Sequence, residues 1–149
     1  MTGLRRSDNP LILQATAREL INNKYNQCIC MYTDGSMTTE GVGAAVVVPQ
    51  LSNLTRKYQL PHVSIFTAEL VAILMALNFF NDLCQPPMEV SFFFLVFFFS
   101  FSDSLSALQA IKHNSQSSRE DVVKEIVVVC HQLITRSTDI VLQWVPYTL

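Results

Sequence analysis

Three carboxylates stand in sequence surroundings that are unusual for charged side chains. Asp34 follows the apolar segment QCICMYT, Glu69 lies alone among apolar residues, and Asp103 follows a phenylalanine-rich run. Simpler interpretations remain open for each. Asp34 beside Gly35 is also typical of a turn. Glu69 also suits the positive end of a helix dipole, and Asp103 also suits a helix cap.

If the fold brings the three acids together, their chemistry is that of a metal site. Neighbouring acids cannot all stay ionised without a counter-charge, which a divalent cation supplies. Oxygen-only ligands suit Mg²⁺, with Mn²⁺ as a substitute, and leave coordination positions for phosphate oxygens. The set therefore indicates phosphoryl transfer or phosphodiester hydrolysis. His62, His113 and His131 lack metal-ligand spacing and add no second site.

For these acids to meet, the elements that carry them must end at one edge of a sheet. The hydrophobic pattern predicts three strands, a helix, a strand, two helices and a last strand. This order is typical of an α/β fold with a mixed sheet flanked by helices, in which sites collect at the carboxyl ends of parallel strands. The expected strands are 27–33, 41–49, 54–60, 97–102 and 139–146. The expected helices are 68–80 with Thr67 as its N-cap, 104–113, and one that starts at the capping pattern 117–120.

The composition fits one domain. The chain has 149 residues, half of them hydrophobic, and its net charge of −2 argues against a broad basic surface for coating DNA or RNA. We predict a lead-in segment at 1–26 and a globular domain at 27–149. Four scattered cysteines without a recognisable signal peptide favour reduced thiols and an intracellular location.

The run from Phe92 to Phe101 raises the question of a membrane segment. It has ten residues, whereas a spanning helix needs about 18 to 20, so we expect no membrane association. The run is longer than a typical buried strand, so its second half, 97–102, is expected to form the strand. The first half then looks inserted. Deleting residues 92–96 is expected to raise soluble yield without moving Asp103.

The segments around the acids resemble the type 1 ribonuclease H family, most closely the ribonuclease H domains of non-LTR retrotransposon polyproteins. Five blocks are similar to the family's signature blocks and occur in its order. They are YTDGS from Tyr32, GVGAAVVV from Gly41, FTAELVAILMAL from Phe66, FSDSLSALQAIK from Phe101 and VLQWVP from Val141.

The resemblance implies a five-stranded mixed sheet whose second strand is antiparallel to the rest. It also implies two-metal hydrolysis of the RNA strand of an RNA/DNA hybrid, with a reverse transcriptase domain in the parent polyprotein. Asp34, Glu69 and Asp103 match the first three catalytic, metal-binding acids. Gly35 and Ser36 match the turn beside the hybrid's backbone, where the missing side chain of Gly35 is expected to allow close approach.

The sequence departs from the family after the last strand. The family's loop histidine, fourth acid and final helix have no counterpart here, so we expect the domain to be shortened and its endonuclease activity impaired. Asp139 precedes the last strand and is expected roughly 20 Å from the correct edge, at about 3.3 Å per strand residue. The alternative is a catalytically inactive remnant that keeps the fold and weak nucleic-acid or metal binding. An actin-like ATP-binding fold is disfavoured, because it needs a second, duplicated domain.

Overall fold

The computed structural model describes residues 11, 12, 15, 19, 29–83, 94–99, 103–113, 119–135 and 140–145; for 29, 30, 50, 83, 94–99, 103, 104, 140, 141 and 143–145 it describes the backbone only. The elements are β1 Ile29–Thr38, β2 Gly41–Val48, the 3-10 helix η1 Pro49–Leu51, β3 Leu54–Leu60, α2 Ile65–Leu83, β4 Phe94–Phe99, α3 Asp103–His113, α4 Glu120–Thr135 and β5 Ile140–Val145. In the expected lead-in segment 1–26, the described residues Leu11, Ile12, Ala15 and Glu19 are helical. The boundary after residue 26 stays a prediction.

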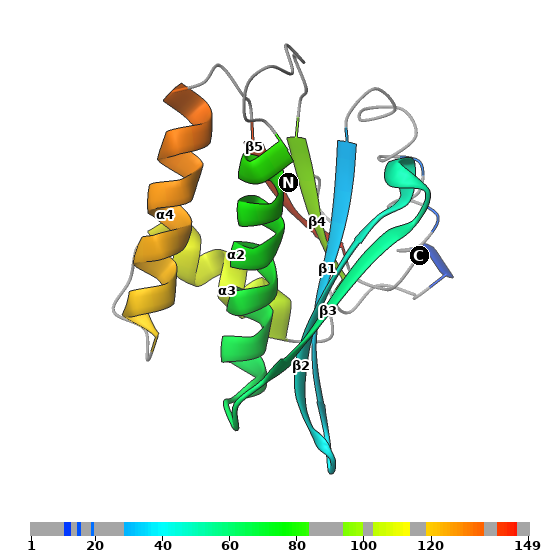
Figure 1. The fold of residues 1–149 in the computed structure, drawn as a ribbon, viewed down its shortest axis with the longest axis vertical. Coiled ribbons are helices and arrows are strands. Elements are labelled where there is room, and N and C mark those ends of the chain that lie inside the picture. The colour runs from blue at the N-terminus through cyan, green and yellow to red at the C-terminus, as the bar shows by residue number, and fades with distance from the viewer. Residues whose placement is uncertain are drawn as a thin grey trace.

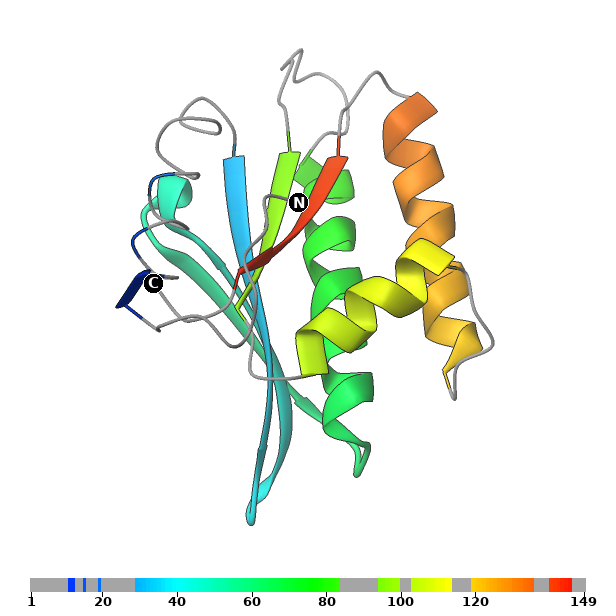
Figure 2. The same ribbon diagram turned by 180° about the vertical axis from the view of Figure 1, so that it is seen from behind.

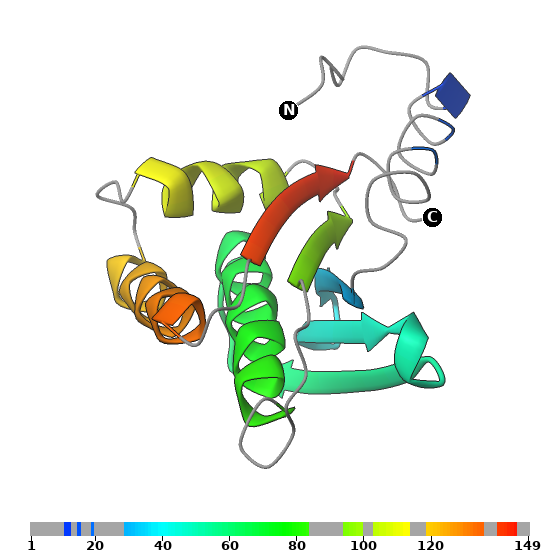
Figure 3. The same ribbon diagram turned by 90° about the horizontal axis from the view of Figure 1, so that it is seen from above.

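The strands form one mixed sheet in the order β3-β2-β1-β4-β5 (Figure 1). β2 is antiparallel to both β1 and β3, whereas β1, β4 and β5 run parallel to one another (Figure 2). α2, α3 and α4 lie on one side of the sheet, and α2 lies between the strands and α4 (Figure 3). The predicted class, an α/β fold with a mixed sheet and flanking helices, is confirmed.

The alternating pattern of β2 explains how the sheet meets α2. Its even-numbered residues, from Val42 to Val48, are buried, and its odd-numbered residues are partly exposed. Successive strand side chains point to opposite faces, so one face of β2 belongs to the core. On α2, Ala68, Ala72 and Ala76 are buried. Small side chains at this spacing let the helix lie close to the strands.

α2 begins earlier than predicted, because Ser64 rather than Thr67 is its N-cap. The backbone N–H of Thr67 donates to Ser64 Oγ at 3.2 Å, which satisfies one of the free amides of the first turn. Thr67 is instead buried inside the helix. The stretch Ile65–Asp82 is long and apolar enough to cross a membrane by length and composition alone, but half of it is buried inside the fold, as in core helices of soluble proteins.

β4 corrects the prediction for the phenylalanine-rich run. The strand is Phe94–Phe99 rather than 97–102. Its first residue pairs with Ile29 on one side and with Ile140 on the other, so both neighbours enter the sheet at the same level. Residues 94–96 therefore form half of a strand that joins β1 to β5. The expectation that the first half of the run precedes the strand is wrong for this reason, and the effect of deleting 92–96 on soluble yield stays a prediction. The remainder of the run lies outside the described residues.

β1 is longer than predicted. It continues through the expected turn as far as Thr38, because its antiparallel pairing with β2 extends to the pair Thr38 and Gly41. The turn consists only of Thr39 and Glu40. Asp34 is therefore inside β1 and not at its end. The interpretation of Asp34 as a turn residue is wrong.

Candidate active site

Asp34 lies where the sheet narrows. The last residue pair between β1 and β4 joins Thr33 to Phe98, and β4 ends at Phe99, whereas β1 continues beside β2 to Thr38. Beyond this point, no described strand flanks β1 on its β4 side. Asp34 is thus level with the carboxyl end of β4, although it is in the middle of its own strand. Side chains from either face of the sheet can meet in such a gap.

Gly35 brings α2 against this part of β1. A Cβ atom at Gly35 would lie 2.6 Å from the backbone nitrogen of Glu69 and 2.8 Å from the carbonyl carbon of Ala68. No side chain fits there, because real Cβ atoms do not approach backbone so closely. The two backbones therefore touch, and Glu69 is positioned beside the immediate neighbour of Asp34.

This contact gives a different reason for glycine at position 35 from the predicted one, while the expected contact of Gly35 with substrate stays a prediction. Its missing side chain makes room for α2, and Gly35 itself is buried, so the space is not available for the backbone of a hybrid. Ser36, the second residue expected to bind substrate, is exposed beside it and remains accessible. Glycine at this position is thus explained by helix packing.

Asp34 and Glu69, the two acids on either side of this backbone contact, differ in burial. Glu69 is 1% exposed and Asp34 is half-buried. Burial raises the pKa of Asp34, because the charged form loses hydration. A carboxylate in such surroundings is stabilised either by a proton or by a nearby cation. Two oxygen donors of this kind fit a hard divalent cation such as Mg²⁺.

The third acid is described only by its backbone. Asp103 is the first residue of α3 and lies four positions after Phe99, the last residue of β4, so it lies within about 14 Å of Phe99. Among the side chains that the structure describes, no group of three His, Cys, Asp or Glu residues is placed to hold a metal. Because the Asp103 side chain is not among them, the three-carboxylate site stays a prediction.

Asp139 cannot be placed directly, since it lies outside the described residues, but β5 locates the residues before it. Ile140 pairs with Phe94 at the start of β4, and the two strands run parallel. The chain therefore enters β5 at the edge of the sheet opposite to the one where β4 ends. The start of β5 is therefore far along the sheet from Asp34, which is level with the end of β4.

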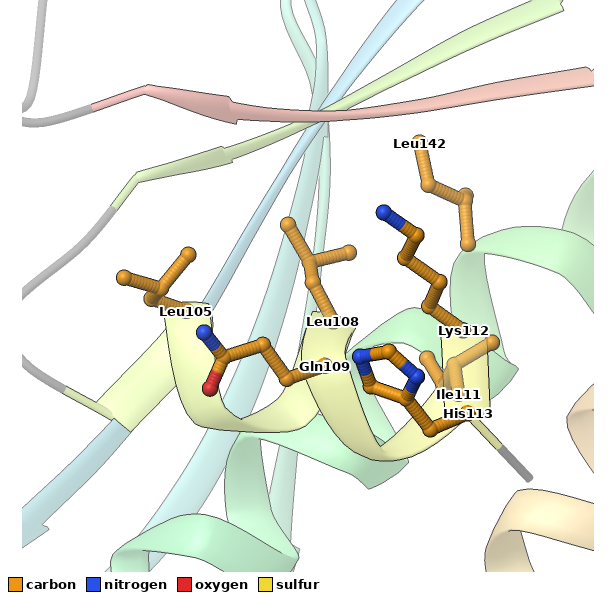
Figure 4. A pocket seen from close by; sticks show the side chains of 7 residues that line it. All are labelled: Leu105, Leu108, Gln109, Ile111, Lys112, His113 and Leu142. Atoms are coloured by element: carbon orange, nitrogen blue, oxygen red, sulfur yellow. The ribbon is translucent and has the colours of Figure 1, made fainter. Parts of the chain in front are cut away.

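A separate cavity of about 410 Å³ lies between α3 and β5 (Figure 4). Three apolar side chains of α3 and one of β5 line it, together with polar side chains near the end of α3. The lining residues are Leu105, Leu108, Gln109, Ile111, Lys112, His113 and Leu142. Neither Asp34 nor Glu69 is among them, so this cavity is distinct from the acid pair.

One polar residue at the site was not predicted. Thr33 is fully buried, and its hydroxyl makes no hydrogen bond in the structure. The sequence signal was a threonine at the end of the apolar segment QCICMYT, immediately before the first acid. A threonine there is also an ordinary strand residue, so the pattern alone did not distinguish it.

The arrangement of strands and helices is the ribonuclease H fold. The structure is similar to RNase H1 from the halophilic archaeon Halobacterium salinarum NRC-1, with a TM-score of 0.56 and 13% identity over 79% of this chain and 85% of that one. It is also similar to LC11-RNase H1, isolated from compost by a metagenomic approach, with a TM-score of 0.57 and 17% identity over 80% and 85%. No protein-family model matches the sequence, and no curated protein sequence matches it significantly.

Proposed function

We propose that this chain is a metal-dependent endonuclease that hydrolyses the RNA strand of RNA/DNA hybrids. The observation that carries the proposal is the contact at Gly35, which brings the backbone of the buried Glu69 against the residue next to Asp34, level with the carboxyl end of β4. The likeness to two RNase H1 structures supports it at the level of the fold.

In this proposal Asp34, Glu69 and Asp103 hold Mg²⁺, or Mn²⁺ in its place. The bound ions supply charge neutralisation at the phosphate and activation of a water molecule. The protein contributes rigid placement, because α2 is fixed against β1 at Glu69. Burial raises the pKa of Asp34 by disfavouring its charged form, and a nearby cation would offset that cost. Ser36 is exposed next to the acids and is suited to hydrogen-bond the sugar-phosphate backbone of the hybrid.

The finer features of the proposal rest on the sequence. The order and wording of the signature blocks support an origin in a non-LTR retrotransposon polyprotein, where a reverse transcriptase domain is the natural neighbour. The four scattered cysteines support an intracellular location. Only three of the family's four acids have counterparts in residues 1–149. We infer that this stretch alone turns over slowly, because the missing acid helps to hold the ion that activates water.

A cleavage assay with a labelled RNA/DNA hybrid tests the function. We expect cleavage of the RNA strand with Mg²⁺ or Mn²⁺ and none with EDTA, and no cleavage of duplex DNA. Asp34→Asn is expected to lower the rate roughly a hundredfold or more, because a metal ligand is lost. Asp82→Asn is the matched control, since Asp82 is an exposed acid at the other end of α2.

Three outcomes separate the alternatives. Metal-dependent cleavage that disappears in Asp34→Asn and persists in Asp82→Asn supports the enzyme. Binding of Mn²⁺ or hybrid without any cleavage supports the inactive remnant. Equal cleavage by both variants contradicts the proposed site.

A further inference from the structure

The hydroxyl of Thr33 is a polar group that the described part of the fold leaves unexplained. Thr33 is 0% exposed, and its Oγ1 atom is fully buried without a hydrogen-bond partner. Buried polar groups are nearly always hydrogen-bonded, and a valine of the same shape would fill this space at no such cost. A hydroxyl at this position therefore needs a reason other than packing.

Its position relates it to the acid pair. Met31, Thr33 and Gly35 are buried alternate residues of β1 and so share one face of the strand. Gly35 identifies that face, because it touches the backbone of α2 at Ala68 and Glu69. Two strand residues span only about 6.7 Å, so the Thr33 hydroxyl lies on the side of β1 from which Glu69 approaches. Asp34 is its immediate neighbour in the chain.

We propose that Thr33 is a positioning residue for Glu69. In the metal-bound protein its hydroxyl donates a hydrogen bond to the Glu69 carboxylate and so fixes the orientation in which that carboxylate meets the cation. Carboxylates that bind metals are commonly held by such outer hydrogen bonds. A threonine hydroxyl rotates freely enough to make this bond on demand. The inference rests on the proposed metal site and adds a residue that acts through Glu69 without touching the ion.

The proposal predicts opposite effects on stability and on metal binding. Thr33→Val keeps the shape of the side chain and removes a hydroxyl that has no partner in the metal-free protein. Its urea unfolding midpoint in EDTA is therefore expected to equal or exceed that of the wild type. Its affinity for Mn²⁺, measured by titration calorimetry without nucleic acid, is expected to fall by about 10- to 100-fold.

Two further variants separate positioning from packing. Thr33→Ser keeps the hydroxyl and loses a methyl group, so it is expected to unfold at a lower urea concentration yet bind Mn²⁺ nearly as tightly as the wild type. Thr55→Val, at an exposed threonine of β3, makes the same chemical change away from the acids. We expect it to leave Mn²⁺ affinity unchanged.

Each contrary result is distinguishable. If the wild type binds Mn²⁺ and Thr33→Val binds it equally well, the role of Thr33 is overturned while the proposed function stands. If Thr33→Val unfolds or loses stability without metal, the hydroxyl has a structural role and the proposal is likewise overturned. Loss of affinity in Thr33→Ser shows that packing matters and not the hydroxyl. If the wild type binds no Mn²⁺, both the metal site and the role of Thr33 fall.

Discussion

Acidic side chains stand near the start of both α2 and α4, but their surroundings are opposite. At α4, Arg119 donates two hydrogen bonds to Asp121, at 3.0 and 2.9 Å, and Lys124 pairs with Glu120 at 2.9 Å. Asp121 is exposed, and the hydrogen bonds from Arg119 lower its pKa to about 2. At α2, Glu69 is buried against β1.

The pKa shifts of the two regions have opposite signs, and this difference is informative. Asp121 obtains its counter-charge from a residue two positions away, so its charge is balanced locally and at the surface. Burial raises the pKa of Asp34, and long-range packing of α2 brings the backbone of Glu69 against the next residue, Gly35. Acids whose charge is balanced by sequence neighbours form a solvated helix start. Acids that tertiary packing brings together out of water are the better candidates for a site.

The largest expected effect comes from breaking the contact between β1 and α2. Gly35→Ala places a methyl group 2.6 Å from the Glu69 backbone nitrogen, so the helix must move. We expect the free energy of unfolding to fall by about 1–3 kcal/mol, as in overpacked cores. Gly43→Ala is the control, because its methyl group would meet only Tyr58 O at 3.3 Å and Ser36 Oγ at 3.4 Å. If urea denaturation shows that both variants lose the same free energy of unfolding, the close contact between Gly35 and α2 does not explain the loss.

A smaller effect on folding stability is expected from neutralising Asp34, whose pKa is raised by burial. The raised pKa of Asp34 means that the folded protein binds its proton more tightly than the unfolded chain does. Stability therefore falls as pH rises from the unfolded pKa through the raised folded pKa. Asp34→Asn should remove this pH-dependent loss of stability. In EDTA the variant should therefore be more stable than the wild type near pH 7, and the two should be about equally stable at about pH 3. Urea midpoints across this range measure it, and an Asn variant that is less stable near pH 7 would contradict it.

The smallest effect on folding stability is expected from neutralising Asp121, the exposed acid at the start of α4. The lowered pKa of Asp121 gives a contribution that is present above its unfolded pKa and lost as pH falls through about 2. Solvent and salt screen a fully exposed ion pair, so Asp121→Asn should leave the urea midpoint near pH 7 unchanged within error. A clear loss of stability, or any loss of Mn²⁺ binding, would remove the contrast between the two helix starts.

Local sequence patterns were sufficient to predict the strands that pair regularly with their neighbours in the sheet. The segments GVGAAVVV and LTRKYQL predicted β2 and β3 nearly to the residue. The apolar stretch that contains Glu69 predicted a buried helix, and the fold packs the backbone of that helix at Glu69 against Gly35, the residue after Asp34. These features depend on periodicity and on the cost of burying charge, which a chain carries without its partners.

Other features were decided only by the tertiary structure. β1 extends past Asp34 because β2 pairs with it as far as Thr38, and β4 begins at Phe94 because β1 and β5 both offer partners at that level. The requirement for glycine at Gly35 comes from the backbone of a helix more than thirty positions away, and the unpartnered hydroxyl of Thr33 exists only once α2 covers that face. A sequence specifies which residues prefer to be buried or extended, but where a strand stops and which backbones touch depend on the neighbours that the whole fold supplies.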